Sequence, residues 1–259
     1  MEVINQIVFF VIGLCFGSFL SVVTDRIFRR KKGIFFGQSE CPKCKHKLTF
    51  LNLIPLLSWL MQKGKCSYCK KPISVKYPAL ELITGLLFLS NYNFFFNNSP
   101  LLCIYYCLVG LVLMAICFSD LEKHRIPNIF LYLWIVLTIP QLLLDSIPFN
   151  ELLIGRLISL TIVSVLFGGQ YLVSKGKWLG SGDLYIAFGM AIFFNWPELL
   201  VALAITYLFG GILGLILILT KKLKLKQAIP FAPLLTLGIL IALYHGADIA
   251  AWYASTLLI

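Results

Sequence analysis

Residues 199–220 read LLVALAITYLFGGILGLILILT and contain no charged side chain. A helix needs about 20 mainly apolar residues to cross the hydrocarbon core of a bilayer, and this run is long enough. Six further runs are also free of charge, and they cover residues 3–24, 82–119, 126–144, 157–174, 184–197 and 227–247. The repeated pattern predicts an all-α polytopic membrane protein.

The run 82–119 is long enough for two helices, and polar residues in its middle indicate a turn between them. These residues are Asn91, Asn93, Asn97, Asn98, Ser99 and Pro100. The run 184–197 is short for a full crossing and could form a half-inserted helix. With one run divided, the sequence predicts about eight transmembrane helices.

The composition agrees with this class of protein. Of 259 residues, 59% are hydrophobic and 13% are charged, whereas soluble domains carry about 25% charged residues. A soluble globular enzyme, a disordered chain and a secreted disulfide scaffold are therefore excluded. The net charge of +11 has to be examined first as a signal for membrane orientation.

Basic residues are concentrated between particular apolar runs. All but one of the 22 lysine and arginine residues fall in segments 26–77, 120–125, 175–183 and 221–226, and the exception is Arg156. Because cytosolic loops are enriched in basic residues, we expect these four segments in the cytosol and the N-terminus outside.

The first apolar run has no basic residue before it, and a basic cluster follows it. This order predicts a transmembrane helix rather than a cleaved signal peptide. The cluster consists of Arg26, Arg29, Arg30, Lys31 and Lys32. Because the basic residues are spread over four loops, we expect attraction to anionic lipid and no nucleic-acid partner.

Two CxxC pairs lie in the first cytosolic segment, Cys41-Pro-Lys-Cys44 and Cys66-Ser-Tyr-Cys69. Four thiolates complete the tetrahedral coordination of a structural zinc ion. A loop of about 50 residues is too small to fold on a hydrophobic core alone, so a stapling metal is expected. A redox or disulfide role and metal-free cysteines are the alternatives, although the reducing cytosol disfavours disulfides.

These features predict three parts of the chain. Residues 1–28 form the first transmembrane helix, residues 29–77 form a small zinc-bound cytosolic loop domain, and residues 78–259 form seven transmembrane helices. Acidic residues at the cytosolic ends of the helices are then the main candidates for a functional site, because placing a charge at the membrane edge costs free energy.

Asp120 and Asp183 both fall at cytosolic ends of predicted helices. Two carboxyl groups that share a site do not both ionise easily, and such a pair can activate water and polarise a peptide carbonyl. Gly180 and Gly182 precede Asp183 and would let a bound strand approach closely. The alternatives are an ion pair of Asp120 with a nearby basic residue and an N-cap role for Asp183.

Glu81 follows Pro78 in the first turn of a predicted helix, where the helix dipole favours an anion. From the residues alone, a structural role for this glutamate and a binding role both remain open. The same holds for the two aspartates, which could also bind cations or protons in a small transporter.

Five motifs in this order resemble the bacterial type IV prepilin peptidases, a family of GxGD-type membrane aspartic proteases. They are Gly17-Ser-Phe-Leu-Ser-Val-Val23 with Arg26, the two CxxC pairs, Tyr77-Pro-Ala-Leu-Glu81, Asp120 with Ile126-Pro127-Asn128, and Gly180-Ser-Gly-Asp183. The resemblance covers most of the chain. It implies that Asp120 and Asp183 are catalytic and that Gly180 and Gly182 position the substrate.

The resemblance further implies cleavage of the basic leader from prepilins or pseudopilins at the cytosolic face of the bacterial plasma membrane. Such substrates serve type IV pili, type II secretion or competence. Members with the cysteine loop also methylate the new N-terminus with S-adenosylmethionine, and Glu81 is the candidate residue for that cofactor.

Two positions depart from the family pattern. Tyr185 stands where members usually carry lysine, and Ser21 stands where they usually carry asparagine. The expected aspartates and cysteines are all present, so the implied peptidase activity and zinc site are unaffected. A catalytically silent scaffold of a secretion machine and a small transporter are the competing functions.

Overall fold

The computed structural model of this chain describes residues 1–29, 37–145, 148–220 and 230–257. Two compact units divide the chain, Met1–Phe118 (unit 1) and Ser119–Ile259 (unit 2). Over the described ranges the regular structure is helical, apart from two isolated β-bridges. The predicted all-α class is confirmed. The predicted basic residues Arg30, Lys31 and Lys32 and the segment 221–226 lie outside the described residues.

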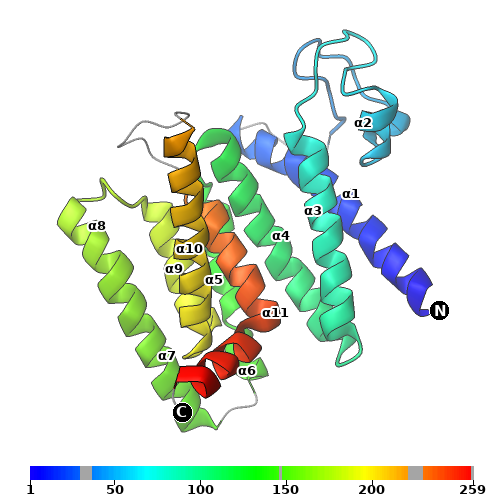
Figure 1. The fold of residues 1–259 in the computed structure, drawn as a ribbon. Coiled ribbons are helices and arrows are strands. Elements are labelled where there is room, and N and C mark those ends of the chain that lie inside the picture. The colour runs from blue at the N-terminus through cyan, green and yellow to red at the C-terminus, as the bar shows by residue number, and fades with distance from the viewer. Residues whose placement is uncertain (30–36, 146–147, 221–229, 258–259) are drawn as a thin grey trace. The chain divides into compact units, whose positions relative to one another are not determined.

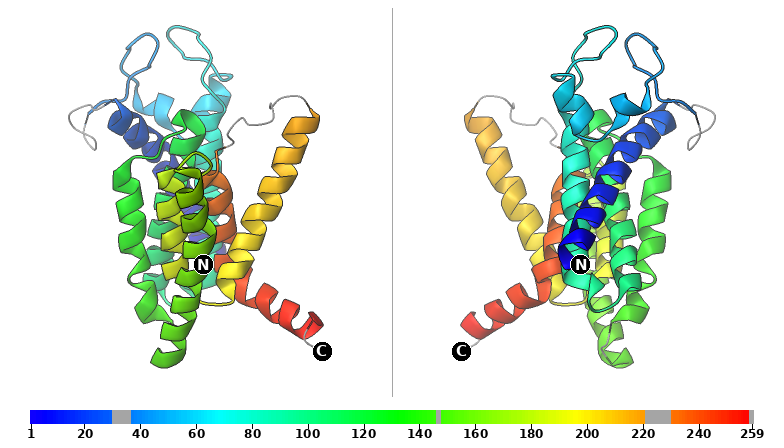
Figure 2. Two further views of the ribbon diagram at one scale, coloured as in Figure 1. Left: turned by 90° about the vertical axis from the view of Figure 1, so that its left-hand side faces the viewer. Right: turned by 90° about the vertical axis from the view of Figure 1, so that its right-hand side faces the viewer.

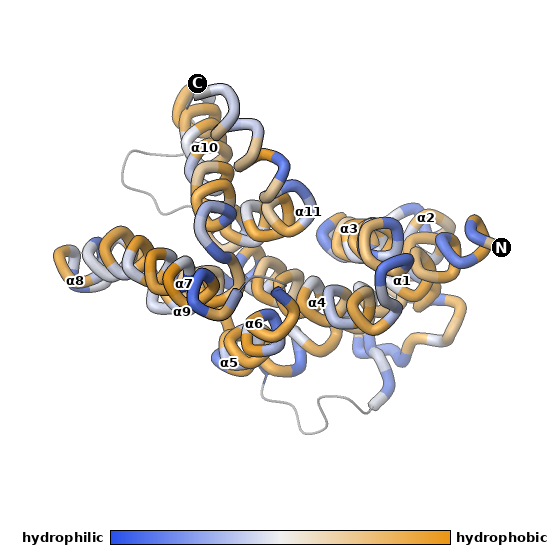
Figure 3. The backbone as a smooth tube through the Cα atoms, turned by 90° about the horizontal axis from the view of Figure 1, so that it is seen from below, coloured by the Kyte–Doolittle hydropathy of each residue, from blue (hydrophilic) through white to orange (hydrophobic). Residues whose placement is uncertain are grey.

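Six helical segments in the described ranges are long and apolar enough to cross a membrane. They are Glu2–Phe28, Lys76–Phe96, Pro100–Lys123, Phe149–Ser174, Glu198–Leu219 and Ala232–Thr256. The two remaining predicted segments form shorter apolar helices, Asn128–Leu144 and Ser181–Phe193. Hydrophobic residues run along most of the helices, as Figure 3 shows. The protein is therefore a multi-pass membrane protein, and within the described ranges six of the eight predicted segments reach full spanning length.

Unit 1 is built on three long helices (Figure 1). They are α1 (Glu2–Phe28), α3 (Lys76–Asn91) and α4 (Pro100–Lys123), the last of which ends in unit 2. Helices α1 and α3 pack closely at Gly13, which has no side chain. A Cβ atom there would lie only 2.7 Å from the carbonyl oxygen of Thr84. Gly13 and Gly17 are spaced as in the small-xxx-small contacts of membrane helices.

The predicted turn at residues 91–100 is shorter than expected. Helix α3 continues as the π-helical segment η2 (Tyr92–Phe96). Aromatic packing accounts for this extension, because the ring of Phe9 in α1 lies 5.0 Å from Tyr92 and 5.6 Å from Phe96 between centroids. Asn93 also accepts a hydrogen bond from Gln6 at 3.0 Å. These contacts stabilise a helical conformation at asparagines that the sequence alone associates with a turn.

Unit 1 also contains two short helices of the cysteine loop, η1 (Phe50–Leu53) and α2 (Leu57–Met61). Unit 2 contains the remaining helices, shown in Figures 1 and 2. They are α5 (Asn128–Thr138), α6 (Gln141–Leu144), α7 (Phe149–Val163), η3 (Ser164–Gly168), α8 (Gly169–Ser174), α9 (Ser181–Phe193), α10 (Glu198–Leu219) and α11 (Ala232–Leu257). The buried residues of α10 all belong to its first half, between Leu199 and Thr206. Its second half leans away from the other helices of this unit (Figure 2).

Helices α5 and α9 are joined by one tight contact. The indole of Trp134 is fully buried and donates a hydrogen bond from Nε1 to the carbonyl oxygen of Ile186 at 3.1 Å. Gly189 makes room for this ring, because a Cβ atom there would overlap Nε1 of Trp134. The contact fixes α5, which follows Asp120 in the chain, against α9, which carries Asp183.

Candidate active site and metal centre

Asp120 lies in the last turns of α4 and is 9% exposed. Its carboxylate accepts a hydrogen bond from the backbone N–H of Ala232, the first residue of α11. The free N–H groups of a helix N-terminus favour an anionic partner, so this hydrogen bond orients the carboxylate. Lys123 pairs instead with Glu122, at 3.3 Å. Among the described contacts, Lys123 is therefore not the ion-pair partner of Asp120.

Asp183 is the third residue of α9, whose N-cap is Gly180. It is therefore not the N-cap residue that one alternative proposed. Its carboxylate accepts a hydrogen bond from the backbone N–H of Gly180. An acidic side chain at the third helical position that reaches back to the N-cap N–H is one half of a capping box. This local contact fixes the orientation of the Asp183 carboxylate.

The two aspartates come together within unit 2. The charge of Asp120 acts on Asp183, so the carboxyl groups are close enough to repel each other when both are ionised. The connecting segments also meet, because a Cβ atom on Gly182 would lie 3.2 Å from Cδ1 of Ile126. The structure thus joins the segments 120–128 and 180–183, which carry two of the five motifs.

The two glycines before Asp183 both lie in close contact with neighbours. A Cβ atom on Gly180 would lie 3.2 Å from Oδ2 of Asp183, and Gly182 faces Ile126 as described. These contacts give the glycines a packing role, and their role in positioning a substrate stays a prediction. Tyr185, where the family usually has lysine, packs edge-on against Tyr132 at a centroid distance of 6.5 Å.

The four cysteines of the CxxC pairs converge in unit 1. The Sγ atoms of Cys41, Cys44, Cys66 and Cys69 all lie within 4.8 Å of one another, and those of Cys41 and Cys69 are 4.0 Å apart. Four thiolates at zinc–sulfur bonding distance lie about 3.8 Å apart in a tetrahedron. The cluster could therefore hold a metal ion such as zinc, and all four cysteines are free of disulfide bonds.

The two CxxC pairs adopt the same local conformation. In the first, the N–H of Cys41 bonds to the carbonyl of His46 and the N–H of Lys45 bonds to that of Cys41. In the second, Cys66 bonds to Lys71 and Lys70 to Cys66 in the same way. Lys45 and Lys70 also share a positive φ, of 60° and 59°. Each pair is thus a short hairpin that turns two sulfur atoms to the same side.

The pKa values of the cysteine thiols also favour the binding of a metal ion. Burial raises the pKa of Cys41, but hydrogen bonds from the N–H groups of Cys44 and Lys43 outweigh it and lower the pKa to about 7. The N–H of His46 lowers the pKa of Cys44, but contacts with Cys41 and Cys69 raise it to about 11. The thiols therefore share protons, and a bound cation would replace those protons.

Glu81 lies in the second turn of α3 rather than in the first. Its Oε2 accepts a hydrogen bond from the backbone N–H of Leu56 at 2.8 Å, which ties the loop between the CxxC pairs to this helix. Glu81 also lines a cavity between α1, the cysteine loop and α3. It belongs to unit 1, whereas Asp120 and Asp183 belong to unit 2.

Sequence reasoning missed two residues that support the aspartates. Ala232 supplies the N–H that binds Asp120, and Trp134 joins α5 to α9. The signal for Ala232 was Pro233, because proline is frequent in the first turn of a helix and thus marks where the free N–H groups lie. Trp134 gave no local signal, because an apolar residue in an apolar run has no distinguishing neighbour.

Two family models match this chain. The model of the bacterial peptidase A24 N-terminal domain matches residues 11–95, and that of the type IV leader peptidase family matches residues 107–215. The first contains the cysteine loop and Glu81, and the second contains both aspartates. No solved structure matches the chain.

Curated relatives match over nearly the whole length. A prepilin leader peptidase/N-methyltransferase of Aeromonas salmonicida is 31% identical over 96% of this chain and 94% of the relative. Proteins of the same name from Bacillus subtilis and Pseudomonas aeruginosa are 30% and 26% identical, over 95% and 93% of this chain and 96% and 91% of the relatives. On these matches, the chain belongs to the type IV leader peptidase family.

Proposed function

We propose that this protein is an aspartic endopeptidase of the bacterial plasma membrane that removes the leader of prepilins or pseudopilins. Its relatives are named prepilin leader peptidase/N-methyltransferase. The observation that carries the proposal is the approach of the Asp120 and Asp183 carboxyl groups at the ends of two helices. Two carboxyl groups that share a site are the catalytic groups of an aspartic peptidase.

In the proposed reaction the pair shares one proton. The ionised carboxylate takes a proton from water, and the resulting hydroxide forms a bond to the carbonyl carbon of the scissile peptide. The protonated carboxyl group donates to the carbonyl oxygen. Collapse of the tetrahedral intermediate breaks the C–N bond, and the leaving nitrogen takes a proton from the pair. The pair titrates as a unit, so neither aspartate is assigned to one role.

Two backbone contacts support this chemistry. The N–H of Ala232 holds the Asp120 carboxylate, and the N–H of Gly180 holds that of Asp183. Oriented carboxyl groups lose less freedom when the substrate binds, which lowers the barrier to reaction. Gly180 and Gly182, in this proposal, leave space for the unwound peptide around the cleavage point.

The basic residues support an orientation in which the N-terminus lies outside and both the cysteine loop and the aspartates face the cytosol. Residues 1–28 would then be the first transmembrane helix, 29–77 the cytosolic loop domain, and 78–259 the membrane peptidase domain. Anionic lipid would contact the basic segments. The prepilin leader is itself basic, and its cleavage point would lie at the cytosolic interface.

We further propose that Cys41, Cys44, Cys66 and Cys69 bind one structural zinc ion. The converging sulfur atoms and the hydrogen bonds to Cys41 support a closed four-thiolate site. A site of this kind leaves no open position on the metal, so the ion would organise the loop and would not act on substrate.

The relatives' name also supports methylation of the freed N-terminus. S-adenosylmethionine supplies an electrophilic methyl group when bound. The uncharged amine nitrogen of the new N-terminus would form the bond to that methyl carbon, and the electron pair of the broken C–S bond would remain on sulfur. Glu81 is the residue proposed for this cofactor, because it lines a cavity beside the cysteine loop.

The direct test is to incubate the purified protein with a candidate prepilin and S-adenosylmethionine and to analyse both new termini by mass spectrometry. We expect a released leader and a mature chain whose N-terminus carries one added methyl group. A mature chain without the added methyl group would support the peptidase activity and exclude methylation. An intact prepilin in the presence of folded protein would contradict the peptidase.

A further inference from the structure

An exposed apolar surface lies on the cysteine loop of unit 1, between the two CxxC hairpins. The two short helices of this loop form it, η1 (Phe50–Leu53) and α2 (Leu57–Met61). Large apolar side chains that gather on one surface mark an interaction site. We call this surface the apolar edge, and its side chains, which are 57–82% exposed, are Phe50, Leu51, Leu57, Leu60 and Met61.

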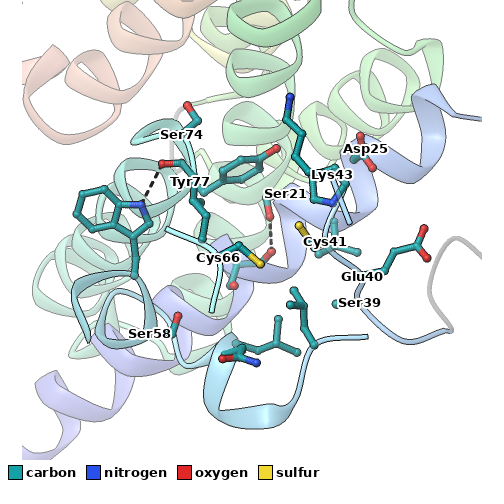
Figure 4. Close-up of a pocket in the computed structure, with 18 of the residues that line it drawn as sticks. Ser21, Asp25, Ser39, Glu40, Cys41, Lys43, Ser58, Cys66, Ser74 and Tyr77 are labelled. Atoms are coloured by element: carbon teal, nitrogen blue, oxygen red, sulfur yellow. Dashed lines mark hydrogen bonds between the residues drawn. The ribbon is translucent and has the colours of Figure 1, made fainter. Parts of the chain in front are cut away.

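Helix α2 has an inner and an outer face. Leu57, Leu60 and Met61 are spaced at i, i+3 and i+4, so they share the outer face. On the inner face, Ser58 and Trp59 line the cavity beside α1 and α3, and Figure 4 shows Ser58 among the lining residues. The packing of the inner face determines which side of α2 is presented outward.

Hydrogen bonds hold the two short helices in this orientation. The indole of Trp59 donates to the carbonyl oxygen of Ile73 at 3.3 Å, which ties α2 to the segment before α3. Gln62, which follows α2, donates to Oδ1 of Asn52 in η1 at 3.4 Å. The two helices therefore present their exposed side chains as one surface of the loop.

The position of α2 along α3 places the apolar edge at the depth of the membrane surface. Glu81, the sixth residue of α3, accepts its hydrogen bond from the N–H of Leu56, which directly precedes α2. Glu81 thus lies about 8 Å along the helix axis from the start of α3. The spanning segment Lys76–Phe96 has 21 residues, and its length of about 30 Å equals the thickness of the hydrocarbon core. Helix α2 therefore begins level with the outer part of a membrane-spanning helix, where lipid surrounds the protein.

The loop that carries the apolar edge is strongly basic. Residues 38–75 contain seven lysines and one acidic residue, Glu40. Two of the lysines, Lys63 and Lys65, follow α2 within four residues and are exposed. An apolar surface flanked by lysines is typical of segments that lie in the membrane–water interface, where the lysines contact anionic headgroups. A cytosolic protein would have to cross the headgroup layer to reach this surface, so the depth of α2 favours lipid.

We infer that the apolar edge inserts into the membrane leaflet at the N-terminal end of α3, with the lysines of the loop at the level of the lipid headgroups. In the proposed orientation this is the cytosolic leaflet. The bilayer then supports α2 from outside, while the cavity lies on its inner side. The metal centre is thereby held at a defined height above the membrane. The inference concerns the loop alone and does not depend on the peptidase or methylation activities.

A photoactivatable amino acid tests the contact directly. A diazirine-bearing residue replaces Met61 in the full-length protein, which is reconstituted in vesicles of phosphatidylcholine and phosphatidylglycerol. After irradiation, mass spectrometry identifies the molecules that are joined to residue 61. We expect phospholipid adducts, about tenfold more abundant than those of the same probe at position 45. Lys45 is an exposed residue at the turn of the first hairpin, and the hairpins lie above α2 in Figure 1.

The headgroup contact has a matched control in the sequence. The tripeptide Lys-Gly-Lys occurs at residues 63–65, after α2, and again at residues 175–177 in unit 2, with both lysines exposed in each. Phosphatidylglycerol should be enriched about two- to threefold among the adducts of residue 61, relative to its share of the lipid. Lys63→Gln combined with Lys65→Gln should lower this enrichment, whereas Lys175→Gln combined with Lys177→Gln should leave it unchanged.

Two results would overturn the inference. Adducts of residue 61 with a second copy of this chain would show that the apolar edge is a protein interface. Lipid adducts no more frequent at residue 61 than at position 45 would show that the edge faces water. Adducts without enrichment of phosphatidylglycerol would overturn the headgroup contact. The same probe in place of Phe50 repeats the measurement on η1, and an unchanged thermal unfolding temperature identifies folded protein in each case.

Discussion

The carboxyl group of Asp183 lies close enough to that of Asp120 for the two charges to repel each other, although one aspartate ends a helix and the other begins one. Such a pair retains a proton more readily than two isolated carboxylates. Backbone N–H groups hold both side chains, so the pair is formed before any substrate binds.

Asp120→Asn and Asp183→Asn should each lower the rate of leader removal by about a thousandfold or more, because an amide can neither take the proton from water nor share one with its partner. The rate is measured by mass spectrometry with a purified prepilin. Asp248→Asn changes an exposed aspartate of α11 and should process at the wild-type rate. Normal processing by either active-site variant would refute the pair.

Ala232→Pro should lower kcat about ten- to hundredfold, because proline lacks the N–H that binds the Asp120 carboxylate. Proline is accepted in the first turn of a helix, so α11 should still form. The thermal unfolding temperature checks folding, and the separation of kcat from KM identifies the step. An unchanged kcat would mean that this hydrogen bond does not position Asp120.

The purified protein should contain about one zinc ion per chain, and Cys41→Ser or Cys66→Ser should remove it, because both cysteines belong to the converging cluster. Elemental analysis measures the metal. Cys15→Ser is a matched control, since Cys15 is an exposed residue of α1 outside the cluster. A folded and active preparation free of zinc would exclude the site.

Gly189→Ala should lower the stability of unit 2 by about 1–3 kcal/mol, because the added methyl group would overlap the ring of Trp134. Thermal unfolding in detergent gives the change. Gly211→Ala also adds one methyl group to an apolar helix, but no side chain lies within 4 Å of it. Equal stability of the two variants would argue against the tight contact between α5 and α9.

The apolar runs and the cysteine spacing predicted much of the fold, since burial in lipid and metal coordination both leave direct marks on sequence. The ends of the helices were harder to predict from the sequence. Asn91 and Asn93 indicated a turn, but aromatic contacts of Tyr92 and Phe96 extend the helix past them. Likewise Asp248 interrupts an apolar run without ending α11, because an exposed charge is tolerated inside a helix.

The site was predictable where its chemistry is local to a motif. Asp120, Asp183 and the four cysteines were identified from residue type, spacing and resemblance. The N–H of Ala232 and the cavity beside Glu81 were not, because both depend on segments that are distant in sequence and meet only in the folded chain. A backbone donor also has no signature in the identity of its residue.

Gly189 and Trp134 depend on each other, because the large indole ring fits only where residue 189 has no side chain. Should one of them change as the family diverges, the other has to change with it, since a methyl group at 189 fits only beside a smaller ring or an aliphatic residue at 134. The two positions should therefore co-vary among homologous sequences. An alignment that showed this co-variation would indicate from sequence alone that α5 and α9 are neighbours.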